Sequence, residues 1–167
     1  LLEIGDKSDY INNKSHVIGF SKINVSDLHS ESNGNILVSL QFTEDHTNND
    51  NLKLKDEIFV FVKENPKHTF YLKHHPRFNN EVDLSEILNL ENVHIAPVQL
   101  MNCFEKCSIH LTAYSTTTFE AASYAIPTIF FTSLQKKFNM FYEDFKYPVV
   151  NDLQLIENNY LECSKRV

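Results

Sequence analysis

Residues 109–131 read IHLTAYSTTTFEAASYAIPTIFF, and this stretch decides the fold class. It starts with an apolar run, continues through hydroxyl residues into a helical pattern, and returns to an apolar run that follows Pro127. Short apolar runs separated by helical patterns recur along the chain, at 36–40, 69–73, 93–96, 109–113, 128–131 and 149–150. This alternation is typical of a parallel sheet with helices on its faces. We therefore predict an α/β fold, with a Rossmann-like parallel sheet of about six strands flanked by helices.

The segments between these runs carry apolar residues at helical spacing. The stripes are Leu54, Ile58, Phe61 and Val62, then Phe138, Phe141, Tyr142 and Phe145, and finally Leu153, Ile156 and Tyr160. Each stripe predicts a helix with one face packed against the sheet. The intervals between the strands suit right-handed crossovers.

The overall charge excludes one class of partner. The chain has 167 residues, with 15 Lys+Arg against 22 Asp+Glu and a formal net charge of −7. Such a surface repels a polyphosphate backbone, so we expect no nucleic-acid partner. A small anionic ligand remains compatible with this charge only where the chain concentrates its cations.

Composition and segment lengths bear on compartment and domain organisation. The apolar runs are far shorter than the roughly 20 residues that span a bilayer, and we expect a cytoplasmic protein, with peripheral association at the inner membrane face left open for a full-length form. Cys103, Cys107 and Cys163 lack metal-type spacing and are interpreted as reduced thiols. Residues 1–34 read as a lead-in or linker from a missing or truncated N-terminal domain, and 35–167 as a ligand-binding domain.

The first candidate ligand segment follows the apolar run 69–73. Ligands of parallel α/β folds bind at the carboxyl ends of the strands, where Lys73, His74, His75, Pro76 and Arg77 fall. Four potentially cationic side chains in five residues form a local positive site suited to phosphate. Pro76 favours an extended conformation at His75, whose imidazole would then project from the strand end. The alternative is an ordinary basic surface turn.

The second candidate segment is the hydroxyl run of 115–118. Ser115, Thr116 and Thr117 at a helix start offer O–H donors, and we expect free backbone N–H groups beside them, which together suit a phosphate. Helix capping alone is the competing interpretation, because Ser115 is a good N-cap and Thr117 with Glu120 matches a capping box. Glu120 would repel phosphate, so a functional role for it would be to accept hydrogen bonds from ribose hydroxyls.

A third segment, the acidic loop 41–47, follows the first apolar run. Gln41 is a candidate hydrogen-bond partner of a ligand, whereas the loop carboxylates are expected to be solvated. The sequence has no Walker-type loop, no Gly-x-Gly-x-x-Gly, no zinc spacing and no nucleophile elbow. We expect neither a metal nor another cofactor.

The order of these motifs resembles the C-terminal, donor-binding half of GT-B glycosyltransferases, over roughly 35–151. More narrowly, a His-Pro pair followed by Ser-Ser/Thr and then a Pro-initiated strand is similar to bacterial sialyltransferases, polysialyltransferases and related capsule or lipopolysaccharide enzymes. In that group these motifs bind the CMP part of a CMP-activated sugar. The resemblance implies that His75 contacts the donor phosphate or leaving group as a catalytic residue, and that Ser115 and Thr116 hold phosphate.

The resemblance leaves alternatives open. UDP-sugar enzymes of the same architecture, including non-hydrolysing sugar 2-epimerases, carry a similar Ser-containing loop followed by Glu-Ala, and there the Glu binds ribose, as Glu120 would. Ala125 stands where that pattern has Gly. The implied partners are a CMP- or UDP-activated sugar and a glycan acceptor held by an N-terminal domain, without which we expect little or no transfer. A non-enzymatic α/β ligand-binding or signalling domain is the alternative from another class.

Overall fold

The computed structural model describes residues 32–76, 82–136 and 147–160. Most of the lead-in (1–31), Arg77, the stripe at 138–145 and Cys163 lie outside the described residues. The proposed boundary near residue 34 therefore stays a prediction. Gly34 immediately precedes the first strand with a φ of 75°, a left-handed conformation that glycine adopts without steric cost.

A parallel sheet forms the centre of the domain. Its strands are β1 (Asn35–Ser39), β2 (Thr69–Lys73), β3 (Val93–Ile95), β4 (Ile109–Thr112) and β5 (Thr128–Phe130). They lie in the order β3-β2-β1-β4-β5, and every pair is parallel. The order reverses direction between β1 and β4, as in doubly wound folds. The predicted α/β, Rossmann-like class is confirmed.

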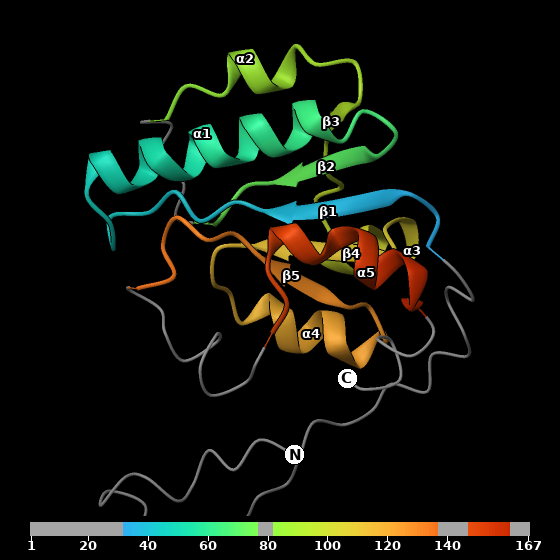
Figure 1. Cartoon of the computed structure of the whole chain (residues 1–167). Coiled ribbons are helices and arrows are strands. Elements are labelled where there is room, and N and C mark those ends of the chain that lie inside the picture. Colours follow the sequence, from blue (N-terminus) through green and yellow to red (C-terminus); the bar gives the residue numbers. More distant parts are fainter. Residues whose placement is uncertain (1–31, 77–81, 137–146, 161–167) are drawn as a thin grey trace, which may run out of the picture.

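Helices cover both faces of this sheet (Figure 1). The helices are α1 (Asn48–Glu64), α2 (Ser85–Leu88), α3 (Leu100–Lys106), α4 (Thr117–Ser123) and α5 (Leu153–Asn158). Side chains of α1, α2 and α5 share one core cluster with one face of the strands, whereas those of α3 and α4 share a second cluster with the other face. The predicted stripes of α1 and α5 are buried as expected.

The sixth predicted strand, at 149–150, is reduced to a single bridge. Val149 pairs in parallel with Phe130, and the chain then enters a 3-10 turn, η2 (Val150–Asp152). The Asp152 carboxylate accepts the backbone N–H of Val149 at 3.0 Å and so stabilises the turn by which the chain leaves the sheet. The described residues therefore form five strands and one bridge, where about six strands were predicted.

Helix α1 is defined by its cap. The Thr47 hydroxyl accepts the N–H of Asp50 at 3.2 Å, and the Asp50 carboxylate accepts the N–H of Thr47 at 3.3 Å. Such a reciprocal cap contributes about 1 kcal/mol to helix stability. The cap fixes the residue at which the loop after β1 ends and α1 begins.

Helix α4 is capped differently from the prediction. Thr117 is its first residue rather than its cap, and the Ser115 hydroxyl accepts the N–H of Thr117 at 3.2 Å. The competing interpretation, a capping box between Thr117 and Glu120, is therefore wrong, because the helix begins at Thr117 itself, one residue too early for Thr117 to be its N-cap. At the other end Ala125 adopts a φ of 56°, the left-handed conformation of a Schellman motif, which explains why glycine is common at such a position.

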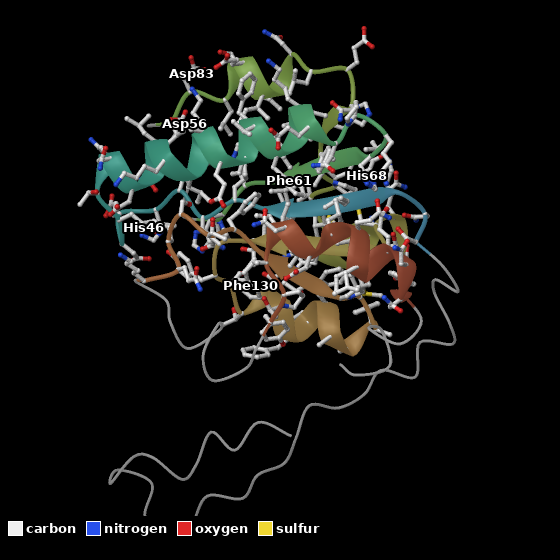
Figure 2. The ribbon with its side chains drawn as sticks, viewed as in Figure 1. His46, Asp56, Phe61, His68, Asp83 and Phe130 are labelled. Carbon is white, nitrogen blue, oxygen red and sulfur yellow. The ribbon has the colours of Figure 1, made fainter. Side chains whose placement is uncertain are left out.

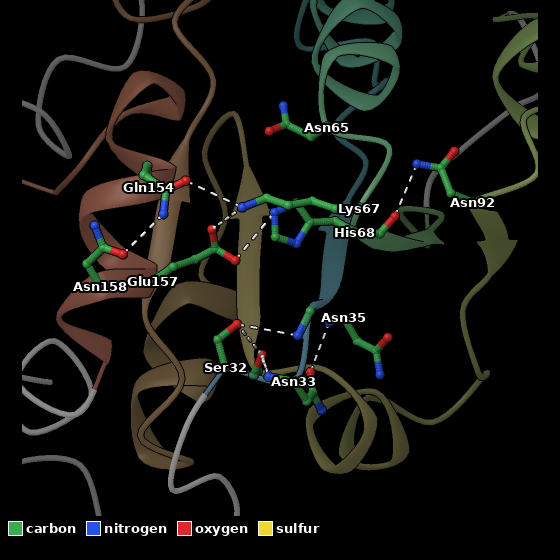
Figure 3. Close-up of polar contacts among 12 residues, drawn as sticks. Ser32, Asn33, Asn35, Asn65, Lys67, His68, Asn92, Gln154, Glu157 and Asn158 are labelled. Atoms are coloured by element: carbon green, nitrogen blue, oxygen red, sulfur yellow. Dashed lines mark hydrogen bonds and ion pairs between the residues drawn. The ribbon is translucent and has the colours of Figure 1, made fainter.

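Helix α5 docks at the edge where the strands begin (Figure 3). The Glu157 carboxylate lies 3.1 Å from Lys67 Nζ and 3.4 Å from His68 Nε2. Burial lowers the pKa of His68, and the nearby Glu157 charge opposes that shift. The buried Tyr160 hydroxyl donates to the Ser108 carbonyl at 2.8 Å and joins the end of this segment to the start of β4.

Candidate site at the carboxyl edge of the sheet

The three segments singled out in the sequence follow three adjacent strands. Gln41 comes after β1, 74–76 after β2, and 115–117 after β4, and these strands lie side by side in the order β2-β1-β4. Carboxyl ends of parallel strands meet at one edge, and the crevice outside a switch point is the usual ligand site of such folds. The fold therefore brings the segments to a common edge that the sequence alone did not define.

Lys73 binds the neighbouring loop at this edge. Its Nζ donates to the carbonyl oxygens of Pro97 at 3.0 Å and Val98 at 2.6 Å, in the loop between β3 and α3. Two of the three N–H groups of the ammonium are thus used within the protein. Its positive charge still lies beside the turn after β2, but its main contacts hold the neighbouring loop.

The histidines after β2 are partly accessible. His74 and His75 are half-buried and Pro76 is exposed. Burial, followed by the positive charge of Lys73, lowers the pKa of His74, so this imidazole is neutral at pH 7. A neutral imidazole is able to donate one hydrogen bond to a phosphate oxygen.

The hydrogen-bond donors that the hydroxyl run presents to a ligand are side-chain hydroxyls and not the backbone N–H groups of the helix. The N–H groups of Thr117, Thr118 and Phe119 donate to Ser115 Oγ, Ser115 O and Thr116 O, at 3.2, 3.1 and 2.9 Å. The expectation that this turn presents free N–H groups is therefore wrong at these three residues, because the chain satisfies them internally. Ser115 accepts a hydrogen bond and keeps its own hydroxyl proton for donation. Ser115 and Thr117 are half-buried and Thr116 is exposed.

The two remaining predicted residues differ in exposure. Gln41 is 5% exposed and lies within the folded domain. Glu120 is exposed on α4, where its charge is solvated. Of the two side chains, only that of Glu120 is accessible from solvent, as contact with a ribose would require.

Sequence reasoning missed a contact between two of these loops. The Tyr114 hydroxyl lies 2.7 Å from His46 Nε2, and Thr43 Oγ1 lies 3.5 Å from the same hydroxyl. In the sequence, His46 is a single histidine in the acidic loop 41–47. The position of His46 in the chain was the one indication of this contact. His46 follows β1 and Tyr114 follows β4, and these two strands are neighbours at the switch point.

A second missed contact fixes the loop after β5. The Glu57 carboxylate of α1 accepts the N–H and the hydroxyl of Thr132, both at 2.7 Å, and the N–H of Ser133 at 2.8 Å. Charge-assisted hydrogen bonds of this length are among the stronger ones in proteins. A single helical carboxylate therefore holds the turn that follows β5.

Other features of the described residues lie elsewhere or do not point to a metal. A hollow of about 480 Å³ lies at the opposite edge, where β2 and β3 begin, and Lys67, His68 and Asn92 help to line it.

Within 32–76, 82–136 and 147–160, His, Cys, Asp and Glu form no group of three that would hold a metal ion. In that same part of the chain, no helix has the length and apolar character needed to cross a membrane. Cys103 and Cys107 are buried thiols, and burial raises the pKa of Cys107 to about 12.

Comparison with known proteins supports the fold. No protein-family model matches the sequence, and no curated protein matches it either. Among solved structures, the wall teichoic acid polymerase TagF aligns with a TM-score of 0.55 at 19% identity, over 84% of this chain and 39% of the TagF chain. Two variants of TagF align with TM-scores of 0.56 and 0.53 at 18% identity, with the same coverage. The chain thus spans well under half the length of the TagF chain and shares the fold of that part.

Proposed function

We propose that this chain is the donor-binding half of a GT-B glycosyltransferase that builds a bacterial surface polysaccharide. The donor is a nucleotide-activated sugar, CMP-linked in preference to UDP-linked. The glycan acceptor binds a separate N-terminal half, so the domain alone binds the donor nucleotide without transferring its sugar.

One observation carries the proposal: the His-Pro turn after β2 and the hydroxyl run after β4 flank β1 at the carboxyl edge. A cation-bearing turn and a set of hydroxyl donors at a switch point suit the phosphate of a nucleotide. The likeness in fold to part of the wall teichoic acid polymerase TagF supports this assignment. In chemical terms, the site positions the nucleotide and stabilises negative charge on the departing phosphate.

Within this proposal each residue has a distinct task. His75 contacts the donor phosphate or leaving group, and Ser115, Thr116 and Thr117 hold phosphate oxygens. Glu120 accepts hydrogen bonds from ribose. Lys73 and Pro76 shape the turn that carries His75, and Gln41 completes the edge after β1.

Calorimetric titration with CMP, CDP, UDP and GDP tests the proposal. We expect binding of CMP to be tighter than that of UDP or GDP. His75→Ala should weaken it by roughly ten-fold or more, the worth of one hydrogen bond to a charged group. The matched control is His94→Ala, because His94 is an exposed histidine that lines the hollow at the opposite edge. No binding of any nucleotide at millimolar concentration would overturn the proposal.

A preference for UDP that Glu120→Ala abolishes would instead favour the UDP-sugar enzymes. In that case the domain is still a donor-binding half, but the nucleotide assignment is wrong. Unchanged affinity in His75→Ala would leave His75 as a surface residue.

A further inference from the structure

The loop after β1 folds back on the loop after β4 at the switch point. His46 and Tyr114 meet there, with Nε2 and the hydroxyl 2.7 Å apart and the rings edge-on at 5.1 Å between centroids. His46 is 8% exposed although the two preceding residues, Glu44 and Asp45, are exposed. Figure 2 places His46 at the end of the sheet opposite His68. The contact therefore lies at the edge that carries the proposed site.

The β1 side of this contact is held by its own hydrogen bonds. Thr43 Oγ1 donates to the Asp45 carboxylate at 3.0 Å, and the Asn51 side-chain amide donates to the Thr43 carbonyl at 3.3 Å. The His46 N–H donates to the same carbonyl at 3.3 Å. Thr47, the cap of α1, follows directly. The imidazole is thus presented by a loop with little freedom to move.

The β4 side leads straight into the hydroxyl run. Tyr114 immediately precedes Ser115, whose hydroxyl accepts the N–H of Thr117. The Thr112 hydroxyl donates to the Ser39 carbonyl at 3.1 Å and also approaches the Tyr114 carbonyl at 3.5 Å. Tyr114 therefore joins the contact with His46 directly, through the backbone, to the first hydroxyl of the run.

We propose that His46 and Tyr114 form a positioning pair for the nucleotide site. The pair holds the hydroxyls of 115–117 in the orientation that binds phosphate, and it makes their orientation depend on the loop after β1. This inference rests on the proposed function and deepens it. Both residues act through the hydroxyl run, and neither is assigned a contact with the reacting atoms.

Titration of CMP against three single variants and one double variant tests the pair. Tyr114→Phe removes one oxygen atom and keeps the ring, and His46→Ala removes the imidazole. Each should weaken CMP binding by roughly five- to twenty-fold, and the double variant should be no weaker than the worse single variant. His46→Gln should recover part of the loss, because its amide is able to hydrogen-bond the tyrosine hydroxyl.

Tyr160→Phe is the matched control. It also removes a buried tyrosine hydroxyl in a short hydrogen bond, to Ser108 O at 2.8 Å, but at the opposite edge of the sheet. It should lower the thermal midpoint without changing CMP affinity.

The outcomes separate the two claims. Binding of CMP by the unmodified chain with equal affinity in Tyr114→Phe and His46→Ala would overturn the positioning role alone, as would losses that simply add in the double variant. Failure of the unmodified chain to bind any nucleotide would overturn the proposed function, and the positioning role with it. Should His46→Ala fail to fold, Tyr114→Phe carries the test.

Discussion

The two faces of the sheet are built on different principles. On the face covered by α1, α2 and α5, the strand residues are apolar and packed, with Ile36, Val38, Leu72 and Leu111 at 0–1% exposure. On the face toward α3 and α4, several buried strand residues are polar instead of apolar, namely Ser39, His110, Thr112 and Thr128. The first face is stabilised mainly by the burial of apolar side chains, whereas the second depends on each buried polar group having a hydrogen-bond partner.

His110 is the centre of the polar face. It is fully buried, with Nδ1 3.0 Å from Thr128 Oγ1 and Nε2 2.9 Å from Ser39 Oγ. Burial lowers its pKa to about 3, so the imidazole is neutral and serves as one donor and one acceptor between two hydroxyls. These contacts join β1, β4 and β5 on either side of the switch point.

The largest expected effect is on the apolar face. Leu72→Ala should reduce the free energy of unfolding by about 3–4 kcal/mol. The side chain of Leu72 is 0% exposed, so its truncation leaves a cavity in the core. Chemical denaturation measures the change. Leu52→Ala is the control, since Leu52 is 52% exposed on α1 and its loss should cost well under 1 kcal/mol. Equal losses in the two variants would contradict the assignment of this face as the main source of stability.

Removing the hydrogen bonds of the polar face should reduce the free energy of unfolding somewhat less, and the losses should not add from one residue to the next. His110→Leu leaves two buried hydroxyls without their partner and should cost about 2–3 kcal/mol. Replacing the whole set, with His110→Leu, Ser39→Ala and Thr128→Val together, should recover part of that loss, because no orphaned polar group then remains. Denaturation of the single and triple variants measures this, and strictly additive losses would show that the network does not act as a unit.

The polar face should also make stability depend on pH. The folded-state pKa of His110, about 3, lies below its ordinary value of 6.5. Its contribution is therefore fully present above about pH 6.5 and is lost as the pH falls toward 3, because the unfolded state binds the proton first. Between pH 7 and pH 5 the loss from this group is about 2 kcal/mol. Denaturation midpoints of the unmodified chain and of His110→Gln measure it, and a slope that persists unchanged in His110→Gln would assign the effect to other groups.

The smallest expected effect concerns the backbone on the polar side. Ala125 holds a left-handed φ of 56° at the end of α4. Ala125→Gly should stabilise the domain by about 0.5–1 kcal/mol, because glycine adopts this conformation without a Cβ clash. Thermal denaturation measures the gain. Ala122→Gly, within the same helix, is the control and should destabilise by a similar amount.

Much of the fold was accessible from local pattern. Apolar runs located β1 to β5 within a residue or two, and the stripe from Leu54 to Val62 located α1, because burial of one face imposes a period on the sequence. The sixth strand was predicted wrongly because the chain enters the 3-10 turn η2 directly after Val149, and the apolar pair Val149 and Val150 gives no sign of that turn. The capping of α4 was predicted wrongly for a similar reason. Ser115 and Thr117 both match a cap in the sequence, but the backbone path makes Thr116 the N-cap, and its side chain forms no cap hydrogen bond.

The candidate site was accessible only in part. Residue chemistry singled out the turn at 73–76 and the run at 115–117, because clustered cations and hydroxyls are visible in a sequence. The engagement of Lys73 with Pro97 and Val98 was not visible, since its partners lie 24 and 25 residues away. The contact between His46 and Tyr114 spans 68 residues and was equally hidden.

The sequence by itself determined the class of fold, the strands and the residue types gathered at their ends, because these depend on periodicity and composition along the chain. The tertiary structure alone decided which of those residues meet. The strand order β3-β2-β1-β4-β5 sets β1 beside β4, and so brings His46 to Tyr114 and His110 between Ser39 and Thr128. Such contacts form only when distant segments are placed side by side, and their geometry is therefore a property of the folded sheet.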